Sequence, residues 1–182
     1  MKKILSIIFS TAVFLLCGCG VVHAIPEGNW QFPKNIKTYI QPGHKNSVMM
    51  RHAFEEWERV TNHNLGFTFV SSRAVAKIRV EFVKKIDTRN QEELDRAIGL
   101  TQIYAPPRSK KLLKANIWIA DLTQDGRTLS RDEVYTTMLH EIGHALGLNH
   151  TDDPESVMYP NANVIQEISK ADLKRLSDRY GW

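Results

Sequence analysis

The chain has 182 residues, which is enough for one domain with a sizeable core and marginal for two. Hydrophobic residues make up 42% and charged residues 24%, which are ordinary globular values and exclude a disordered or membrane-spanning body. Setting aside residues 1–24, which hold two lysines and no acid, leaves 22 basic against 20 acidic residues, so the charge gives no reason to expect a nucleic-acid partner.

The first 24 residues have the layout of a secretory signal peptide. Lys2 and Lys3 precede an apolar run at residues 4–16 that is too short to span a bilayer comfortably, and small residues follow. Two processing outcomes stay open, because VHA ending at Ala24 suits signal peptidase, whereas LCGC resembles a bacterial lipobox with Cys19 as the lipidated residue. We expect a protein that is secreted or held at the cell envelope, with membrane contact only through a lipid on Cys19.

The only cysteines, Cys17 and Cys19, lie in this leader. Residues 25–182, which we take as the folded domain, therefore have no disulfide. The stability of this domain must come from packing or from bound metal.

From Ile25 onward, strand and helix patterns alternate. A short strand is predicted at residues 37–41, and residues 48–60 place apolar side chains at helical spacing. Ile78, Val80 and Phe82 alternate with charged residues, and an apolar run surrounds Ile117 and Ile119, so both segments predict strands. Residues 87–96 are polar and predict a loop or a short helix. A mixed sheet with packed helices follows.

A second polar segment begins at Pro106 and Pro107 and carries four basic residues, Arg108, Lys110, Lys111 and Lys114. Such a run is more often a solvated face than a dedicated site for an anionic partner. We interpret it as a surface loop.

Two further helices are predicted. Ser130 and Glu133 have the spacing of a capping box, so one helix begins there, continues to Leu146 and stops at Gly147. An amphipathic helix at residues 170–179 closes the chain.

The segment after Ser130 also holds a metal-ligand pattern. His140 and His144 stand four residues apart, so a helix presents both imidazoles on one face. Gly147 can adopt a left-handed conformation and turn the chain back, which brings His150 to the same ion. Three imidazoles suit zinc, and a fourth position left to water is typical of a catalytic site.

Glu141 is adjacent to the first ligand. It can accept a proton from a water bound to that zinc and pass the proton to a leaving amine. These residues predict hydrolysis of peptide bonds.

HEIGHALGLNH at residues 140–150 fits the H-E-x-x-H-x-x-G-x-x-H signature, and the methionine of SVMYP follows it. The sequence thereby resembles the metzincin metalloproteases, and Met158 would be the methionine of their Met-turn. Within that clan it most resembles the matrixins, because Pro154 and Met158 lie four and eight residues after His150 and Tyr159-Pro160 completes their M-Y-P. The resemblance implies that Met158 forms an apolar floor beneath the zinc and that Tyr159 is not a ligand.

The resemblance covers nearly the whole domain, with WQFPKNIKTYI like the family's opening strand, AFEEWERVT like its first helix and ISKADLKRLSDRYG like its last. It implies an α+β fold in which a twisted mixed sheet packs with three helices and the active-site helix is followed by the Met-turn. The implied cleft lies along an edge strand near residues 99–104, where a protein or peptide substrate would add as an extended strand. We expect a monomer.

The sequence departs from matrixins at three places. Gln102 occupies the position of a structural-zinc histidine, so we expect one zinc. No cysteine-switch propeptide is visible, because Ile25 is almost immediately followed by the catalytic body. Pro160-Asn161-Ala162 lacks the tyrosine that matrixins place on the wall of the S1′ pocket.

Calcium is a separate question. Residues 121–132 imitate the spacing of a calcium loop, with its oxygen-bearing or glycine positions at Asp121, Thr123, Asp125, Gly126 and Asp132. A simple Asp-Gly turn before the capped helix explains the pattern better. Matrixins bind calcium, so the resemblance leaves calcium open without locating it.

Two alternatives to a general endopeptidase stay open. One is an exported zinc-binding module that has lost catalysis and works by adhesion or inhibition, against which the presence of Glu141 speaks. The other is a zinc hydrolase of cell-wall peptides. The remaining histidines of the domain, His44, His52 and His63, have no ligand spacing and are interpreted as ordinary surface or core residues.

Overall fold

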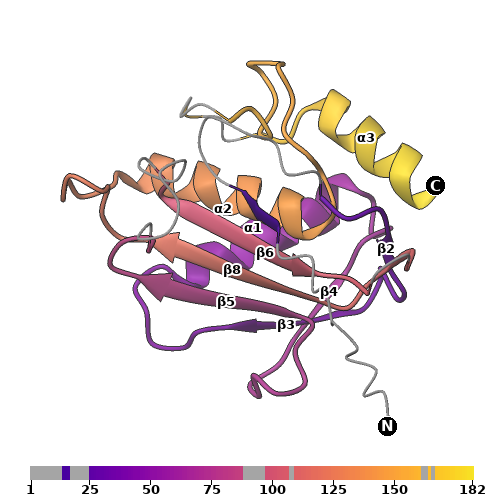
Figure 1. The fold of residues 1–182 in the computed structure, drawn as a ribbon, viewed down its shortest axis with the longest axis horizontal. Coiled ribbons are helices and arrows are strands. Elements are labelled where there is room, and N and C mark those ends of the chain that lie inside the picture. The colour runs from indigo at the N-terminus through magenta and orange to yellow at the C-terminus, as the bar shows by residue number, and fades with distance from the viewer. Residues whose placement is uncertain (1–13, 17–24, 88–96, 107–108, 161–163, 165–166) are drawn as a thin grey trace, which may run out of the picture.

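The structure is a computed structural model that describes residues 14–16, 25–87, 97–106, 109–160, 164 and 167–182. These residues form a six-stranded sheet, a two-stranded sheet and three helices (Figure 1). The strands are β1 (Phe14–Leu16), β2 (Asn29–Trp30), β3 (Ile36–Ile40), β4 (Phe67–Phe69), β5 (Ile78–Val83), β6 (Gly99–Tyr104), β7 (Lys111–Leu112) and β8 (Lys114–Ala120). The helices are α1 (Ser47–Val60), α2 (Arg131–Ala145) and α3 (Lys170–Tyr180).

The large sheet is mixed, as predicted. Its strand order is β1-β6-β8-β5-β3-β4. Strands β4, β3, β5 and β8 are parallel to one another, whereas β6 runs antiparallel to β8 and β1 runs antiparallel to β6. Strands β2 and β7 form a separate parallel pair. The α+β fold expected from the sequence is confirmed.

The core lies between the large sheet and the helices α1 and α2, which cover one of its faces (Figure 1). In β5, Ile78, Val80 and Phe82 are buried while the residues between them are only partly buried, which is the alternation predicted for a strand with one face on the core. Trp57 of α1 is fully buried, and its indole N–H donates to the Leu139 carbonyl of α2 at 3.1 Å.

Helix α2 has the start that the sequence predicts. Ser130 is its N-cap, and its side chain accepts from the Glu133 N–H while the Glu133 carboxylate accepts from the Ser130 N–H. The last helical residue is Ala145, and Gly147 follows with a φ of +104°. A β-carbon at Gly147 would collide with the Arg179 guanidinium, so the turn needs glycine for both its backbone and its space.

Helix α3 ties the beginning of the described domain to the turn after α2. The Arg179 guanidinium donates to the carbonyls of Pro26 and Gly28, and the Tyr180 hydroxyl donates to the Leu146 carbonyl at 2.9 Å. The Ile25 N–H donates to the Asn149 side chain at 2.8 Å. These contacts hold the chain around Gly147 from two sides.

The predicted boundaries of the main elements are close to those observed. The strand expected at residues 37–41 is β3, and the helix expected at residues 48–60 is α1. The interpretation of the basic segment after Pro106 as a surface loop was wrong in part. Lys111 lies in β7, and Lys114 is the first residue of β8, which pairs with β5 and β6 in the large sheet. Pro107 and Arg108 of that loop, and most of the polar segment at residues 87–96, lie outside the described residues.

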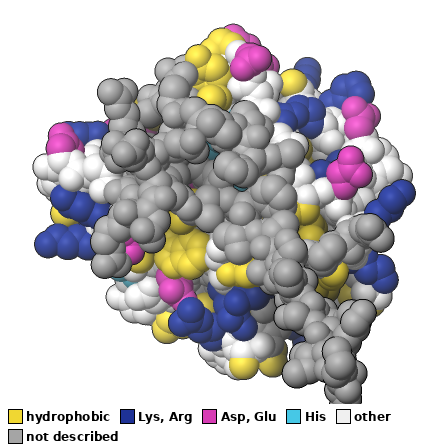
Figure 2. Space-filling model, viewed as in Figure 1, with side chains coloured by type: hydrophobic (Ala, Val, Ile, Leu, Met, Phe, Trp, Pro, Cys, Tyr) yellow, Lys and Arg dark blue, Asp and Glu magenta, His cyan; other side chains and the backbone are white. Residues whose placement is uncertain are grey.

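On the side seen in Figure 2, Lys and Arg side chains lie at several separate places around the margin and in the lower middle, with Asp and Glu among them. Within the described part of the chain, no helix is long and apolar enough to cross a membrane.

The calcium-like segment forms a turn. The Gly126 N–H donates to the Thr123 carbonyl at 3.0 Å, and Leu122 and Thr128 form an isolated bridge. The Asp121 carboxylate lies 3.1 Å from His44 and 3.1 Å from Lys45, so neighbouring side chains already pair with this carboxylate. The Asp-Gly turn preferred from the sequence is the geometry found here.

Candidate metal centre and active site

The three histidines of the signature meet at one point. His140 and His144 project from the same face of α2, and the chain reversal at Gly147 brings His150 against them. The Nε2 atom of His150 lies 3.2 Å from the Nε2 atom of His140 and 3.2 Å from that of His144. Among the described residues, this is the only group of three or more His, Cys, Asp or Glu side chains placed to hold one metal ion.

The other ring nitrogen of each helical histidine is committed to the backbone. His140 Nδ1 lies 2.7 Å from the Val157 carbonyl, and His144 Nδ1 lies 2.8 Å from the Leu148 carbonyl. A carbonyl only accepts, so both Nδ1 atoms carry the proton and both Nε2 lone pairs are directed to the shared point. The two carbonyls thereby set the tautomer that a metal ligand requires.

Burial keeps these imidazoles neutral. It lowers the pKa of His140 from 6.5 to about 4, with a smaller contribution from His150, although the Val157 carbonyl opposes the shift. Burial also lowers the pKa of His144 well below 6.5, followed by the repulsion from the two other histidines. The pKa of His150 is lowered by burial and then by the nearby Arg175 guanidinium. Protons therefore compete weakly for the three Nε2 atoms near neutral pH.

The arrangement fits zinc. Zinc–nitrogen bonds of about 2.0–2.1 Å in tetrahedral geometry place neighbouring ligand nitrogens about 3.3 Å apart. The two Nε2 separations of 3.2 Å match this spacing, and the Nδ1 contacts to carbonyls are the outer partners that zinc-bound histidines use. Three nitrogen ligands, with no fourth ligand among the residues that the structure describes, would leave one position for water or substrate.

Met158 is fully buried in the turn that follows His150, and it lies against Gly143 of α2. A β-carbon at Gly143 would come well inside van der Waals distance of the Met158 sulfur, so α2 approaches this turn through a glycine. The buried Asp172 of α3 accepts from the Ser156 hydroxyl and from the Val157 N–H. Helix α3 thus fixes the backbone whose Val157 carbonyl holds His140.

Glu141 lies on the side of α2 that faces β6. Its side chain is fully buried, and its Oε2 atom accepts from the Thr101 hydroxyl at 2.6 Å. A β-carbon at Gly99 would lie 2.5 Å from Glu141 Oε1. The carboxylate is therefore enclosed by two residues of the strand that the sequence pointed to as the edge of the cleft.

Sequence reasoning placed the three histidines, Glu141, Gly147 and Met158, but it missed four residues that support them: Gly99, Thr101, Gly143 and Asp172. Gly143 occupies an unspecified position of the H-E-x-x-H pattern. The other three contact the site across at least fifteen residues of sequence, as between Asp172 and Val157. The capping-box spacing of Ser169 and Asp172 was a usable signal for the start of α3, but it gave no sign of the contact with Ser156.

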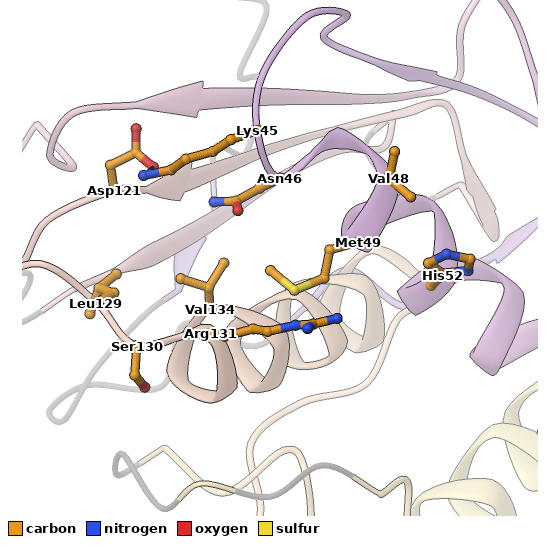
Figure 3. A pocket seen from close by; sticks show the side chains of 10 residues that line it. All are labelled: Lys45, Asn46, Val48, Met49, His52, Asp121, Leu129, Ser130, Arg131 and Val134. Atoms are coloured by element: carbon orange, nitrogen blue, oxygen red, sulfur yellow. Dashed lines mark ion pairs between the residues drawn. The ribbon is translucent and has the colours of Figure 1, made fainter.

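A separate cavity of about 470 Å³ opens between the first turns of α1 and α2 (Figure 3). Its lining mixes charged and apolar side chains: Lys45, Asn46, Val48, Met49, His52, Asp121, Leu129, Ser130, Arg131 and Val134. None of the zinc-site histidines contributes to it. Lys45 pairs with Asp121 and His52 contacts Glu55, so much of its charge is internally balanced.

Comparison with known proteins agrees with the geometry. A model of the Matrixin family matches residues 29–181. The chain is 31% identical to Metalloendoproteinase 2-MMP of Arabidopsis thaliana over 142 residues, which cover 74% of this chain and 36% of the relative. It is 38% identical to Matrilysin of Felis catus over 61 residues, covering 31% and 23% of the two chains. It is 26% identical to Matrix metalloproteinase-27 of Homo sapiens over 141 residues, covering 72% and 26%. The chain thus spans about a third of the length of the first relatives that it matches.

Proposed function

Since the chain belongs to the matrixin family, we propose that it is a zinc-dependent endopeptidase that hydrolyses peptide bonds at the histidine centre of α2. The observation that carries this proposal is the convergence of three neutral imidazoles beside a buried glutamate. A purely structural zinc site is usually closed by four protein ligands and requires no carboxylate next to the first ligand.

Zinc at this centre supplies Lewis-acid chemistry, because it lowers the pKa of a water molecule and polarises a carbonyl. The protein's own contribution to the chemistry is Glu141. Its carboxylate takes a proton from the attacking water, whose oxygen forms a bond to the carbonyl carbon of the substrate. The carbon–nitrogen bond then breaks, and Glu141 delivers the proton to the leaving amine nitrogen.

The substrate is proposed to be a protein or peptide in extended form. Strand β6 supports this, because the side of β6 away from β8 pairs antiparallel with another segment of this chain, β1. The register places Phe14 opposite Ile103 and Leu16 opposite Thr101. A backbone edge that accepts one extended segment can accept another, with main-chain hydrogen bonds holding a substrate strand beside Glu141.

Replacing Glu141 by alanine tests the proposal. We expect at least about a 100-fold loss of peptide cleavage, because a positioned general base contributes this much or more, and an unchanged zinc content, because Glu141 is not a ligand. The measurements are cleavage of a peptide library and zinc per chain by elemental analysis. Glu155→Ala, which changes an exposed glutamate between His150 and Met158, is the matched control and should keep full activity.

Equal cleavage by the Glu141→Ala variant would exclude Glu141 as the base. An unaltered protein that binds one zinc but cleaves no peptide under any condition would instead support a zinc-binding module without catalysis. Cleavage confined to cell-wall peptides would place the protein among cell-wall hydrolases.

We also propose that the protein is exported and acts outside the cytoplasm, either free or anchored at the cell envelope through Cys19. The support is the order of charged, apolar and small residues in the first 24 positions. The mass of the N-terminal peptide in protein purified from its own cells tests this. An intact Met1 in all of the protein would contradict it.

A further inference from the structure

We propose that Thr101 is a positioning residue for the reaction, holding the Glu141 carboxylate in the place from which it acts. The inference rests on the proposed endopeptidase function and assigns a role to a residue of β6 that does not contact the zinc ligands. It concerns the hydroxyl of Thr101 rather than its methyl group.

The contact that carries the proposal is short, buried and directed at a charged group. The Thr101 hydroxyl lies 2.6 Å from Glu141 Oε2 and 3.0 Å from the Glu141 main-chain carbonyl. Thr101 is 2% exposed and Glu141 is 0% exposed. A hydroxyl has one proton to donate, and the nearer, charged acceptor forms the stronger bond. The carboxylate is thereby attached to β6 as well as to its own helix.

The second oxygen of Glu141 occupies space that Gly99 of the same strand leaves open. Gly99 lies two residues before Thr101 on the same face of β6, and a β-carbon there would lie 2.5 Å from Glu141 Oε1 and 2.6 Å from Thr137 Cγ2. Thr101 thus holds one carboxylate oxygen while Gly99 leaves room for the other. The Thr101 hydrogen bond, with the space left at Gly99, favours one orientation among those that a glutamate side chain on a helix can adopt.

The position of this contact couples substrate binding to catalysis. Strand β6 is both the strand whose side facing β1 is proposed to hold the substrate backbone and the strand that holds the carboxylate. A base held by the strand that binds substrate keeps a fixed position relative to the scissile bond, and small misplacements of reacting groups cost large factors in rate. Loss of the hydroxyl should therefore affect turnover more than substrate binding.

The first experiment measures kcat and KM of the full chain with one peptide substrate for Thr101→Val, which removes the hydroxyl at nearly constant shape, and Thr101→Ser, which keeps it. We expect kcat to fall about 10- to 100-fold in the valine variant, with KM changed less than about threefold, and to return to within about threefold of the original in the serine variant. Zinc content should stay the same in all variants.

Thr38→Val is the matched control. Thr38 is also a fully buried strand threonine, but its hydroxyl donates to the Ile36 carbonyl at 3.0 Å, away from the site. Like Thr101→Val, Thr38→Val removes a buried hydroxyl, but its kcat should equal that of the unaltered protein. An unchanged kcat in Thr101→Val, an equal loss in Thr38→Val, or a failure of serine to restore activity would overturn the proposal.

A second measurement does not depend on activity. Urea unfolding of the full chain, with Thr101→Val made in the original background and in Glu141→Ala, gives the coupling between the two side chains. We expect Thr101→Val to reduce the folding equilibrium constant about fivefold more in the original background than in Glu141→Ala. Equal reductions would overturn the proposed contact. If the unaltered protein cleaves nothing, the proposed function and the role of Thr101 in turnover fail together, and the coupling alone then decides whether the contact exists.

Discussion

Gly143 illustrates how the centre depends on a residue with no reactive group. It lies between His140 and His144 on α2, and the absence of a β-carbon there leaves the space that the Met158 sulfur occupies. Spacing alone predicted that His140 and His144 share one face of a helix, and the structure places their imidazoles together. It could not identify Gly143, because the atom that excludes a larger side chain arrives from a turn fifteen residues later in the sequence.

Gly143→Ala is therefore predicted to destabilise the protein. Intrinsic helix propensity alone would give the opposite result, a gain of about 1 kcal/mol. The overlap with the Met158 sulfur should outweigh this gain, with a net loss of about 1–2 kcal/mol in the free energy of unfolding measured in urea.

The combination with Met158→Ala is the control, because it makes room for the added methyl group. Gly143→Ala should cost less in that background than in the original protein. A protein stabilised by Gly143→Ala alone would show that the turn can move away from α2 at no cost.

At the scale of elements, helix ends were the most predictable features. Ser130 and Glu133 carry a local capping signal, and the structure contains the two reciprocal hydrogen bonds. Short strands were the least predictable, because β2 and β7 have two residues each and β4 has three, too few for any period to show. Lys114 was misassigned to a loop because its strand character comes from pairing with neighbouring strands, which no local pattern contains.

The capping box of α2 predicts a dependence of stability on pH. The Arg127 guanidinium and then the Ser130 N–H lower the pKa of Glu133 from 4.5 to about 2. Because the folded pKa is the lower one, this glutamate stabilises the fold above pH 4.5, and the contribution is lost as the pH falls through 4.5 towards 2.

Glu133→Gln should accordingly lower the free energy of unfolding by about 1 kcal/mol at neutral pH, a value that allows for solvent screening of the partly exposed pair. The difference from the original protein should shrink towards zero as the pH approaches 2. Asp132→Asn, in the same first turn, is the control for the general effect of negative charge at a helix start. A difference that persists at low pH would contradict the ionic origin of the effect.

At the scale of the whole molecule, the proposed zinc centre would join parts of the chain that are otherwise connected by packing and hydrogen bonds. Helix α2 would supply two ligands and the loop after Gly147 the third, and α3 holds the turn that contains Met158 through Asp172. Residues 25–182 contain no cysteine, so no disulfide supports these connections.

The overall α+β architecture was predictable because the signature and its flanking segments resemble one family. The contacts between α2 and β6 that surround Glu141 were not, because they depend on how two distant segments pack.

Zinc titration of metal-stripped protein tests most directly whether zinc and catalysis share one site. Removal of zinc by a chelator should abolish peptide cleavage and lower the melting temperature, because zinc bound only to the folded state stabilises it. On return of zinc, cleavage should rise linearly and level off at one zinc per chain, while Glu141→Ala should bind the same single zinc without regaining activity. Cleavage that persists in the stripped protein, or one bound zinc that restores none, would contradict the account.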